Sequence, residues 1–533
     1  MFLRIFSYEF YEFTDSTNLE CSFFTRIKLI ENIMKIGIIG AGVAGLAAAV
    51  RMASLGHDVH VFEANDYPGG KLSEFTLFGV KKEQNTEGVR AYRFDAGPSL
   101  FTMPMYVEEL FEVANVPMHG RFSYQKMDVV CQYFWNDGTA LTAWADVDKL
   151  AQEVENQLVV PTEVTKKILR LAHRKYDLAG KIFLEKSLHK ISTWLSPQIA
   201  KSLVLMPTFD IFKTMNDTHE QLAKHPKLVQ FLNRFATYNG SNPYRASGML
   251  SVIPHFEHGI GCFYPNGGMS QITKSIYELA KLKGAKFYFN SKIAEIIVEN
   301  GKINGLKREN TDGVIEPFDA VISNMDVYFT YKKLLPKLPH PDRILNQERS
   351  TSALIFYWGI KHSFENLHLH NIFFSEDYKH EFDQHALGKV SDDPTVYVNI
   401  TSKLTPSDAP DGCENWFVMV NVPHNSGQDW NAMIKETRKN VIQKISKSLN
   451  VDLESLIEVE ETLTPLSIEA KTQSFGGALY GTSSNSMMSA FLRHKNFSSE
   501  IKNLYFCGGS VHPGGGIPLC LLSAKIVEQV LTP

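Results

Sequence analysis

The clearest pattern of apolar positions in this chain lies near its N-terminus. An apolar run from Lys35 to Ile39 leads directly into three glycines, Gly40, Gly42 and Gly45, and an Ala-rich stretch follows them. An apolar run that ends at closely spaced glycines predicts a buried strand, a tight turn and a helix. The segment Asp58 to Glu63, with apolar residues at positions 59, 61 and 62, predicts a neighbouring strand after that helix.

Similar patterns predict strands and a helix further along the chain. From Phe287 to Gly305, apolar and polar residues roughly alternate on both sides of Glu299-Asn300-Gly301, which is typical of a hairpin. The mostly apolar run Ile517 to Val530 predicts a helix near the C-terminus. Further strands are predicted at residues 320–323, 354–359 and 416–422.

The glycines and Glu63 form, in order, the fingerprint of a dinucleotide-binding unit. Gly40 permits the tight turn, Gly42 lets the backbone approach a pyrophosphate, and Gly45 lets the helix pack closely on the strand. The phosphates then meet the helix N-terminus. Glu63 lies about 20 residues beyond the glycines, where a carboxylate accepts hydrogen bonds from ribose hydroxyls and disfavours a 2′-phosphate. The alternative for Glu63 is a solvated charge at a strand end.

A second glycine turn follows the acidic strand and favours a flavin dinucleotide over a nicotinamide one. Gly69 and Gly70 precede Lys71, so the backbone can approach the same pyrophosphate again with a positive charge beside it. An ordinary surface turn is the alternative for this motif. The stretch Phe94 to Ser99 is rich in turn residues and small side chains, which suits the close approach of a flat ring.

The C-terminal region carries the most specific motif. Residues Tyr505 to Pro518 include five glycines, and this segment is similar to the closing signature of the bacterial phytoene desaturase family of FAD-dependent carotenoid desaturases. Supporting resemblances occur at Phe94 to Ser99, Tyr264 to Met269 and Ala320 to Asn324. The resemblance covers nearly the whole chain from Met34 onward.

The resemblance implies an α/β fold of the flavin amine oxidase or phytoene desaturase type. Its Rossmann-like FAD-binding domain is discontinuous in sequence and carries an inserted α+β substrate domain. We expect the FAD-binding domain at residues 34–120, 251–330 and 461–533, because the FAD-like motifs lie at the start, middle and end. Residues 121–250, mostly helical, and 331–460, richer in strands, would form the substrate-binding and membrane-facing part. Residues 1–33 are expected to be a non-native or disordered extension, because flavoproteins of this kind normally begin near Met34.

The same resemblance implies that the closing segment completes the FAD site and that the last helix directs its N-terminus at the flavin ring. The partial positive charge of that N-terminus would stabilise an anionic reduced flavin. In related flavoproteins the residue matching Ile293 contacts adenine through its backbone, and Asn324 ends a strand close to the cofactor. The expected cofactor-binding residues are Gly40, Gly42, Ala44, Gly45, Glu63, Gly70, Lys71, Gly97, Pro98, Ser99, Ile293, Asn324, Gly508, Gly509, Gly516 and Ile517.

Composition agrees with a large enzyme. The chain has 533 residues, 44% of them hydrophobic, which is enough to form two cores. Its formal net charge is −4 and no Lys/Arg-rich run stands out, so nucleic acid is not an expected partner. The six cysteines show no paired CxxC spacing, which indicates reduced thiols and no metal site.

Contact with a membrane surface is expected because a carotenoid substrate is insoluble in water. No uncharged apolar stretch of about 18 residues occurs, so the sequence predicts no transmembrane helix. The segment Trp194 to Met215 is apolar and aromatic with few charges, and it either enters one leaflet or forms a buried helix pair. The expected location is the cytoplasm, with peripheral attachment to a membrane.

No catalytic residue is assigned from the sequence. Desaturation removes two hydrogens and two electrons; a flavin can take a hydride, and a nearby base or water can take the remaining proton, so a strong base is not needed. His255, Glu257, His258 and, inside the closing motif, His512 are candidates for the base, although each is more readily explained as a hydrogen-bonded structural residue. Positioning in an apolar tunnel is expected to be the main catalytic device, with oxygen or a quinone as electron acceptor.

Three other functions fit parts of the pattern. They are a flavin amine oxidase, a carotenoid isomerase, and a non-enzymatic prenyl-lipid escort protein built on a related fold without FAD. The intact glycines and Glu63 argue against the escort protein. Among desaturases the substrate remains open between phytoene, a partly desaturated carotene, and a hydroxylated carotenoid desaturated at its 3,4-bond. The segments Tyr238 to Tyr244 and Ile253 to Gly259 look somewhat closer to the late-acting hydroxycarotenoid 3,4-desaturases.

Overall fold

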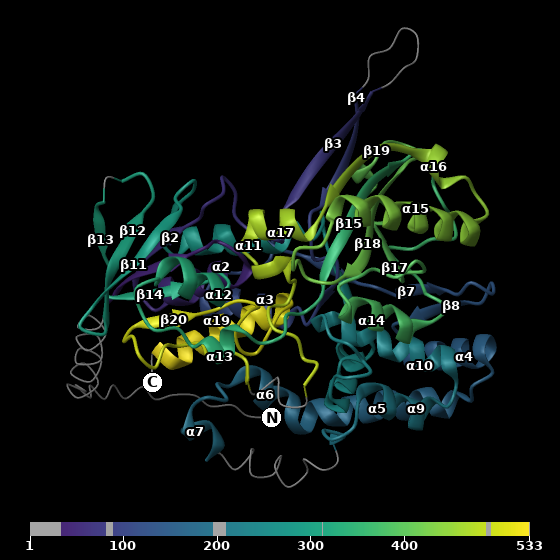
Figure 1. Ribbon diagram of the computed structural model, residues 1–533, viewed down its shortest axis with the longest axis horizontal. Coiled ribbons are helices and arrows are strands. Elements are labelled where there is room, and N and C mark those ends of the chain that lie inside the picture. Colours follow the sequence, from purple (N-terminus) through teal and green to yellow (C-terminus); the bar gives the residue numbers. More distant parts are fainter. Residues whose placement is uncertain (1–32, 81–88, 196–208, 312, 487–491, 532–533) are drawn as a thin grey trace, which may run out of the picture.

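The computed structural model describes residues 33–80, 89–195, 209–311, 313–486 and 492–531. These residues form two lobes that lie side by side in Figure 1. One lobe is built on a five-stranded parallel sheet, and the other on a seven-stranded, mostly antiparallel sheet.

The parallel sheet is assembled from segments that are far apart in the sequence. All four of its neighbouring strand pairs are parallel. Strands from the start, middle and end of the chain meet in this sheet, which confirms the discontinuous Rossmann-like domain. The strand order is β10 (Lys286–Tyr288), β2 (Asp58–Phe62), β1 (Lys35–Ile39), β14 (Ala320–Ser323) and β20 (Leu504–Phe506).

The two helices predicted around the glycine motifs pack on each other beside this sheet. Helix α2 (Val43–Ser54) contacts α19 (Ile517–Leu531) and α11 (Ser270–Leu282). Its alanines are fully or almost fully buried. Small side chains allow this close packing because they let neighbouring helices and strands approach.

The predicted hairpin forms one edge of this lobe. Strand β11 (Ile293–Glu299) pairs antiparallel with β12 (Lys302–Arg308) across Asn300 and Gly301, whose φ angles are 51° and 73°. Positive φ at both turn positions matches the twist of a two-residue hairpin. Phe287 lies outside the hairpin, in β10 of the parallel sheet. The extended backbone is interrupted at Asn290 (φ 49°), between β10 and β11. Strand β13 (Ile315–Pro317) completes the small sheet.

The seven-stranded sheet of the second lobe contains both strands predicted between residues 354 and 422. The longest, β15 and β18, are neighbours, and alternate side chains of β15 enter two separate cores. Helix α15 (Trp430–Leu449) contributes to one of these cores. The strand order is β19 (Ile457–Leu463), β15 (Ser352–Ile360), β18 (Glu414–Val422), β17 (Val396–Ile400), β16 (His370–Phe373), β7 (Val129–Phe134) and β8 (Ala140–Trp144).

A two-stranded ribbon, β3 (Glu74–Val80) with β4 (Val89–Asp95), projects from the junction of the lobes in Figure 1. A separate small sheet has the strand order β5 (Phe101–Thr102), β9 (Cys262–Pro265) and β6 (Tyr124–Lys126). The remaining helices are α3 (Met105–Val113), α4 (Val147–Leu158), α5 (Thr162–Lys175), α6 (Lys181–Glu185), α7 (Ile191–Trp194), α9 (Met215–Ala223), α10 (Pro226–Asn233), α12 (Val327–Phe329), α13 (Asp342–Leu345), α14 (Tyr378–Ala386), α16 (Leu453–Leu456) and α17 (Pro465–Thr472).

Two expectations fall mainly outside the described residues. These are the N-terminal extension, apart from Ile33, and the central part, 196–208, of the apolar segment Trp194 to Met215. In the part of the chain that the structure describes, no helix combines the length and the apolar character needed to cross a bilayer. The five cysteines of that part are free thiols.

Candidate functional site: a cavity lined by both lobes

A continuous cavity of about 1540 Å³ is lined by residues of both lobes. Small-ligand sites typically measure roughly 300–1,000 Å³, so this cavity has room for more than one ligand. One end is lined by the glycine turns at the carboxyl edge of the parallel sheet. The other is lined by apolar side chains of the inserted helical segment, among them Leu184, Leu188, Phe209 and Leu250.

The first glycine turn has the geometry that its spacing predicts. Gly40 has a φ of 94°, a conformation that disfavours any residue with a Cβ. A Cβ on Gly45 would lie 2.0 Å from the Gly40 carbonyl oxygen, so only glycine lets α2 begin this close to β1. Gly42 and Ala44 line the cavity at the start of α2. The first N–H groups of a helix lack intrahelical partners and favour an anion, so this end of the cavity suits a pyrophosphate.

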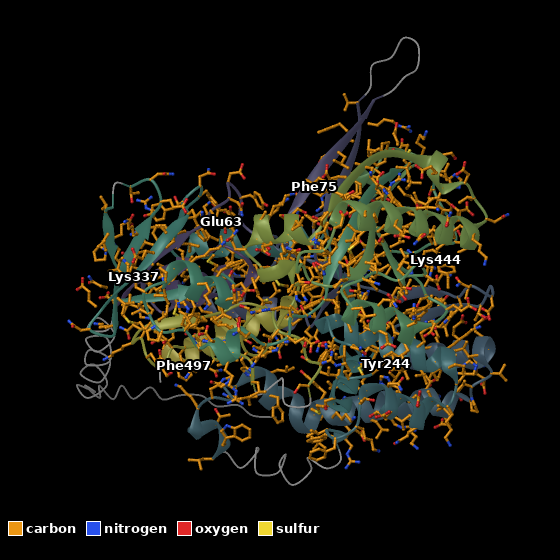
Figure 2. The ribbon with its side chains drawn as sticks, in the orientation of Figure 1. Glu63, Phe75, Tyr244, Lys337, Lys444 and Phe497 are labelled. Carbon is orange, nitrogen blue, oxygen red and sulfur yellow. The ribbon has the colours of Figure 1, made fainter. Side chains whose placement is uncertain are left out.

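Glu63 lies at the end of β2, in the lobe of the parallel sheet (Figure 2). Its side chain orders the first turn, because Oε2 accepts a hydrogen bond from the backbone N–H of Ala41 at 2.8 Å. Oε1 accepts hydrogen bonds from the backbone and side-chain nitrogens of Asn65, both at 2.9 Å. Glu63 is only 6% exposed, so it is not a solvated surface charge. Oε2 therefore keeps a further lone pair for a ribose hydroxyl.

The second glycine turn lies against the first. Gly69 forms a bridge with Gly42, and a Cβ on Gly70 would lie 3.5 Å from the Gly42 Cα. Lys71 Nζ donates to the carbonyl oxygen of Leu479 at 3.2 Å. Burial lowers the pKa of Lys71, and the nearby Asp326 carboxylate opposes this effect. The turn therefore places backbone and a lysine beside the same end of the cavity.

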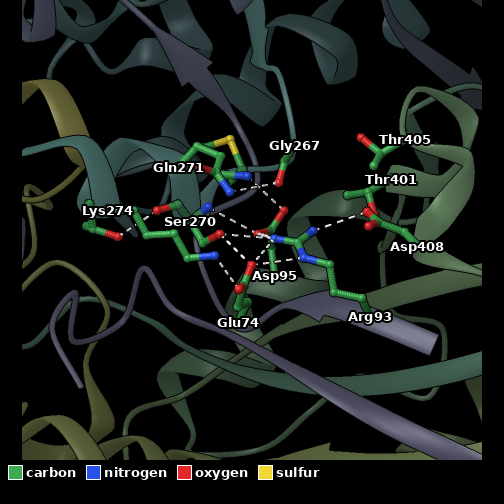
Figure 3. A network of polar contacts seen from close by, with 12 residues as sticks. Glu74, Arg93, Asp95, Gly267, Ser270, Gln271, Lys274, Thr401, Thr405 and Asp408 are labelled. Atoms are coloured by element: carbon green, nitrogen blue, oxygen red, sulfur yellow. Dashed lines mark hydrogen bonds and ion pairs between the residues drawn. The ribbon is translucent and has the colours of Figure 1, made fainter. Parts of the chain in front are cut away.

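Asp95 holds the segment Gly97 to Ser99 in the cavity wall. Its carboxylate accepts hydrogen bonds from two backbone N–H groups at the start of α11, at 2.9 and 3.2 Å. Arg93 forms ion pairs with Asp95, Glu74 and Asp408, at 2.6, 2.7 and 3.1 Å (Figure 3). Asp408 belongs to the second lobe and α11 to the first, so this network joins the β3–β4 ribbon to both lobes.

The closing glycine segment lies against Asn324. A Cβ on Gly508, whose φ is 112°, would lie 2.7 Å from Asn324 Nδ2, and this nitrogen donates to the Cys507 carbonyl oxygen at 3.3 Å. A Cβ on Gly42 would lie 2.7 Å from the other end of the same amide, Asn324 Oδ1. The Asn324 side chain therefore lies between the first and last glycine turns and contacts both of them. Helix α19 begins at Ile517, which also lines the cavity.

With one exception, the residues expected to bind the cofactor line this cavity. The exception is Gly45, which lies behind the first turn and determines how closely α2 packs on it. The absence of a Cβ at several of these positions leaves room for a ligand beside bare backbone, and the residues present fit a dinucleotide. The lining members are Gly40, Gly42, Ala44, Glu63, Gly70, Lys71, Gly97, Pro98, Ser99, Ile293, Asn324, Gly508, Gly509, Gly516 and Ile517.

Of the candidate bases, Glu257 and His512 line the cavity. Burial alone would raise the pKa of Glu257, but its ion pair with Arg234, at 3.0 Å, holds that pKa below its usual value. Burial lowers the pKa of His512 to about 4, and its Nε2 lies 2.9 Å from a backbone carbonyl oxygen. His255 and His258 are buried outside the residues that line the cavity. None of the four has the geometry of an unengaged base facing the cavity.

The cavity wall contains a chain of hydrogen-bonded side chains that the sequence motifs do not predict as a unit. Ser99 Oγ lies 2.8 Å from Tyr397 OH, and Tyr397 OH lies 2.7 Å from His370 Nδ1. All three residues line the cavity. Burial lowers the pKa of His370 to about 4, so its ring is neutral near pH 7 and one ring nitrogen keeps a lone pair that can accept a hydrogen bond. Tyr397 and His370 lie on β17 and β16, and only the sheet brings them to Ser99.

Arg493 is a second residue that the sequence does not signal. It is 3% exposed and lines the cavity beside the closing glycines. Its guanidinium donates to the carbonyl oxygens of Tyr480 and Thr482, at 3.1 and 2.8 Å. Burial lowers the pKa of Arg493 to about 10, which leaves it charged at neutral pH. This end of the cavity therefore carries a fixed positive charge as well as bare backbone.

Comparison with known proteins agrees with this geometry. The chain matches the model for flavin containing amine oxidoreductases over residues 43–528. It is 47% identical over 496 residues to the 1-hydroxycarotenoid 3,4-desaturase of Flavobacterium sp. (strain P99-3), covering 93% of this chain and 98% of that protein. It is 30% identical over 524 residues to the phytoene desaturase of Fusarium fujikuroi, covering 93% and 88%.

Solved structures share the fold. Wild-type putrescine oxidase bound to putrescine matches with a TM-score of 0.59 at 14% identity, covering 94% of this chain and 99% of that one. Cyclohexylamine oxidase from Brevibacterium oxydans IH-35A matches with a TM-score of 0.57 at 15% identity, covering 94% and 100%. The α/β flavin amine oxidase fold and the family resemblance predicted from the motifs are both confirmed. The chain belongs to the flavin-containing amine oxidoreductase family, whose cofactor is a flavin, and it groups there with the carotenoid desaturases.

Proposed function

We propose that this protein is an FAD-dependent carotenoid desaturase that introduces the 3,4-double bond into a 1-hydroxylated carotenoid. The observation that carries this proposal is the cavity of about 1540 Å³, which includes both a dinucleotide-type site and a space lined by apolar side chains. The relatives support the substrate class, because identity is 47% to the 1-hydroxycarotenoid 3,4-desaturase and 30% to the phytoene desaturase.

FAD is proposed because a carboxylate at the end of β2 suits a ribose and two adjoining glycine turns suit a pyrophosphate. The cavity-lining residues named above would hold it, with Gly45 supporting them from behind. We propose that residues 34–120 and 251–330 and the C-terminal segment form the FAD-binding domain. Strand β19 pairs with β15, so we place the start of that C-terminal segment at Thr464 instead of residue 461. The remaining ranges, 121–250 and 331–463, would bind the carotenoid.

The reaction breaks two C–H bonds on neighbouring carbons and forms one C=C bond. When bound, FAD supplies the acceptor for one hydrogen and both electrons, and one proton passes to a base. We propose that Ser99, Tyr397 and His370 conduct that proton, because the neutral ring of His370 ends a continuous hydrogen-bonded chain. The apolar wall would orient the polyene and exclude water. Oxygen or a quinone is the proposed final electron acceptor.

Peripheral attachment to a membrane is proposed from two exposed apolar side chains. Leu195 and Phe212 are 79% and 77% exposed. In sequence, Phe212 directly follows Ile211, and Leu195 lies seven residues beyond Leu188; both Ile211 and Leu188 line the cavity. Exposed apolar residues of this kind can enter the headgroup region. Replacing both residues by serine should reduce co-sedimentation with phosphatidylglycerol vesicles and leave flavin absorbance unchanged. Equal sedimentation with and without vesicles would contradict the proposal.

The function is tested by expressing the protein in bacteria that accumulate either a 1-hydroxylated carotene or phytoene. Each new double bond lengthens the conjugated system, so a product absorbs at longer wavelength. We expect a red shift with the hydroxylated carotene, and none with a flavin-free variant as control. A shift with phytoene alone would make the enzyme an early desaturase. No shift with either pigment, from protein that carries flavin, would refute desaturation and leave isomerase or amine oxidase.

A further inference from the structure

A polar cluster interrupts the apolar part of the cavity. Arg234, Tyr238 and Glu257 all line it. The Arg234 and Glu257 side chains are 5% and 1% exposed, so both charges are withdrawn from water. A buried ion pair is often no more stabilising than apolar residues of similar volume. Hydrocarbon binding alone would therefore not explain this cluster.

The three side chains hold one another in place. Arg234 Nη2 donates to Glu257 Oε1 at 3.0 Å, and Arg234 Nη1 donates to Tyr238 OH at 2.7 Å. Tyr238 OH donates in turn to Glu257, which closes a ring of hydrogen bonds. The Arg234 guanidinium also lies 4.2 Å from the centre of the Phe235 ring. The cluster is thus oriented before a ligand enters, which lowers the entropic cost of binding.

The bonding capacity left in the cluster suits an alcohol. The Tyr238 oxygen uses its hydrogen on Glu257 and one lone pair on Arg234, so one lone pair remains. Tyr238 is partly exposed and lines the cavity, so a ligand can reach it. An alcohol can donate its hydrogen to that lone pair. A hydrocarbon end has no donor and would leave that lone pair without a partner.

The cluster also lies close to the proposed proton acceptor. The charges of Glu257 and Arg234 both act on His370, which is hydrogen-bonded through Tyr397 to Ser99. In a 1-hydroxylated carotenoid, only carbon 2 separates the carbon that bears the hydroxyl from the 3,4-bond. A site for that hydroxyl must therefore lie close to the residues that act on the reacting bond, and the cluster lines the same cavity as Ser99, Tyr397 and His370.

We propose that Arg234, Tyr238 and Glu257 bind the terminal hydroxyl of the substrate and so select hydroxylated carotenoids over hydrocarbon ones. This inference rests on the proposed function and deepens it. Tyr238 and Glu257 also belong to the two segments, Tyr238 to Tyr244 and Ile253 to Gly259, that look somewhat closer to hydroxycarotenoid 3,4-desaturases than to phytoene desaturases.

The test uses Tyr238→Phe, which removes one hydroxyl and keeps the ring. With a 1-hydroxylated carotene we expect kcat/KM to fall about tenfold; with the matching carotene that lacks the hydroxyl it should stay unchanged. Tyr244→Phe is the matched control, because Tyr244 lies in the same lobe (Figure 2) but outside the cavity lining. The already desaturated 1-hydroxylated product should inhibit Tyr238→Phe about tenfold more weakly than the control.

A second variant replaces the ion pair as a unit, Arg234→Met with Glu257→Leu, so that no charge is left buried without a partner. We expect it to keep its flavin absorbance and to lose roughly a hundredfold of its preference for the hydroxylated carotene. An unchanged preference in both variants would overturn the inference and leave the proposed function intact. A wild-type protein that converts neither carotene would instead refute the proposed function.

Discussion

Gly42→Ala is the sharpest test of the cofactor site, because an alanine side chain at this position would clash with one neighbouring residue, Asn324. The φ of Gly42 is −70°, so alanine fits the backbone without strain. Its Cβ, however, would lie 2.7 Å from Asn324 Oδ1, where ordinary contact begins at 3.4 Å. Asn324 has little room to withdraw, since its Nδ2 bonds to Cys507 and lies against Gly508. The turn itself must therefore shift by about 0.7 Å.

That shift moves the start of α2 away from the position where a pyrophosphate would receive its N–H groups. Losing two hydrogen bonds to a charged group costs about 3 kcal/mol, which corresponds to roughly hundredfold weaker binding. We expect the purified Gly42→Ala protein to be largely colourless, and fluorescence titration with FAD to measure the loss of affinity.

Gly56→Ala is the control for this prediction. Gly56 has a φ of 88° and lies just past the end of α2, where an added Cβ would meet nothing within 4 Å. Alanine there should cost about 1 kcal/mol of folding stability through backbone strain and leave FAD affinity unchanged. Full flavin content in Gly42→Ala, or equal loss in both variants, would refute the assignment of this turn to the pyrophosphate.

Three further predictions concern catalysis and stability. Tyr397→Phe interrupts the chain from Ser99 to His370, so kcat should fall about hundredfold or more with unchanged flavin absorbance; an unaltered kcat would exclude this chain as the proton acceptor. Arg93→Met leaves three carboxylates facing one another, and urea unfolding should show a loss of about 3 kcal/mol; an unchanged midpoint would contradict the role given to the network. Burial lowers the pKa of His370 and His512, among other histidines, to about 4 from 6.5. Between these pH values the unfolded chain binds protons that the native state does not, so stability should fall as pH drops, by up to about 1.4 kcal/mol per pH unit for each such histidine. A midpoint in urea that stays constant from pH 6.5 to 4.5 would count against their burial in neutral form.

Local chemistry explains why so much of the cofactor end could be predicted. Glycine spacing, an apolar strand and a carboxylate at the next strand end act within about 30 residues of one another, so the sequence contains the whole unit. Each glycine is required by a contact of the backbone itself, as the 2.0 Å approach of a Gly45 Cβ to Gly40 demonstrates. The hairpin at Asn300 and Gly301 is local in the same way.

The substrate end depends on contacts that no local pattern records. Tyr397 and His370 are ordinary strand residues until β16 and β17 bring them to Ser99, about 300 positions earlier in the chain. In the sequence, nothing distinguishes Arg93 from other charged residues. Its ion pair with Asp408 forms only because the two lobes pack together.

The sequence by itself determined the family, the flavin and the discontinuous α/β domain, because backbone turns tolerate few residues and leave a recognisable spacing. The tertiary structure alone decided which polar side chains stand inside the apolar cavity. Arg234 and Glu257 form an ion pair in the cavity wall, because a single buried charge without a partner would strongly destabilise the fold. The two residues meet only in the folded protein, and their spacing along the chain does not predict the pair.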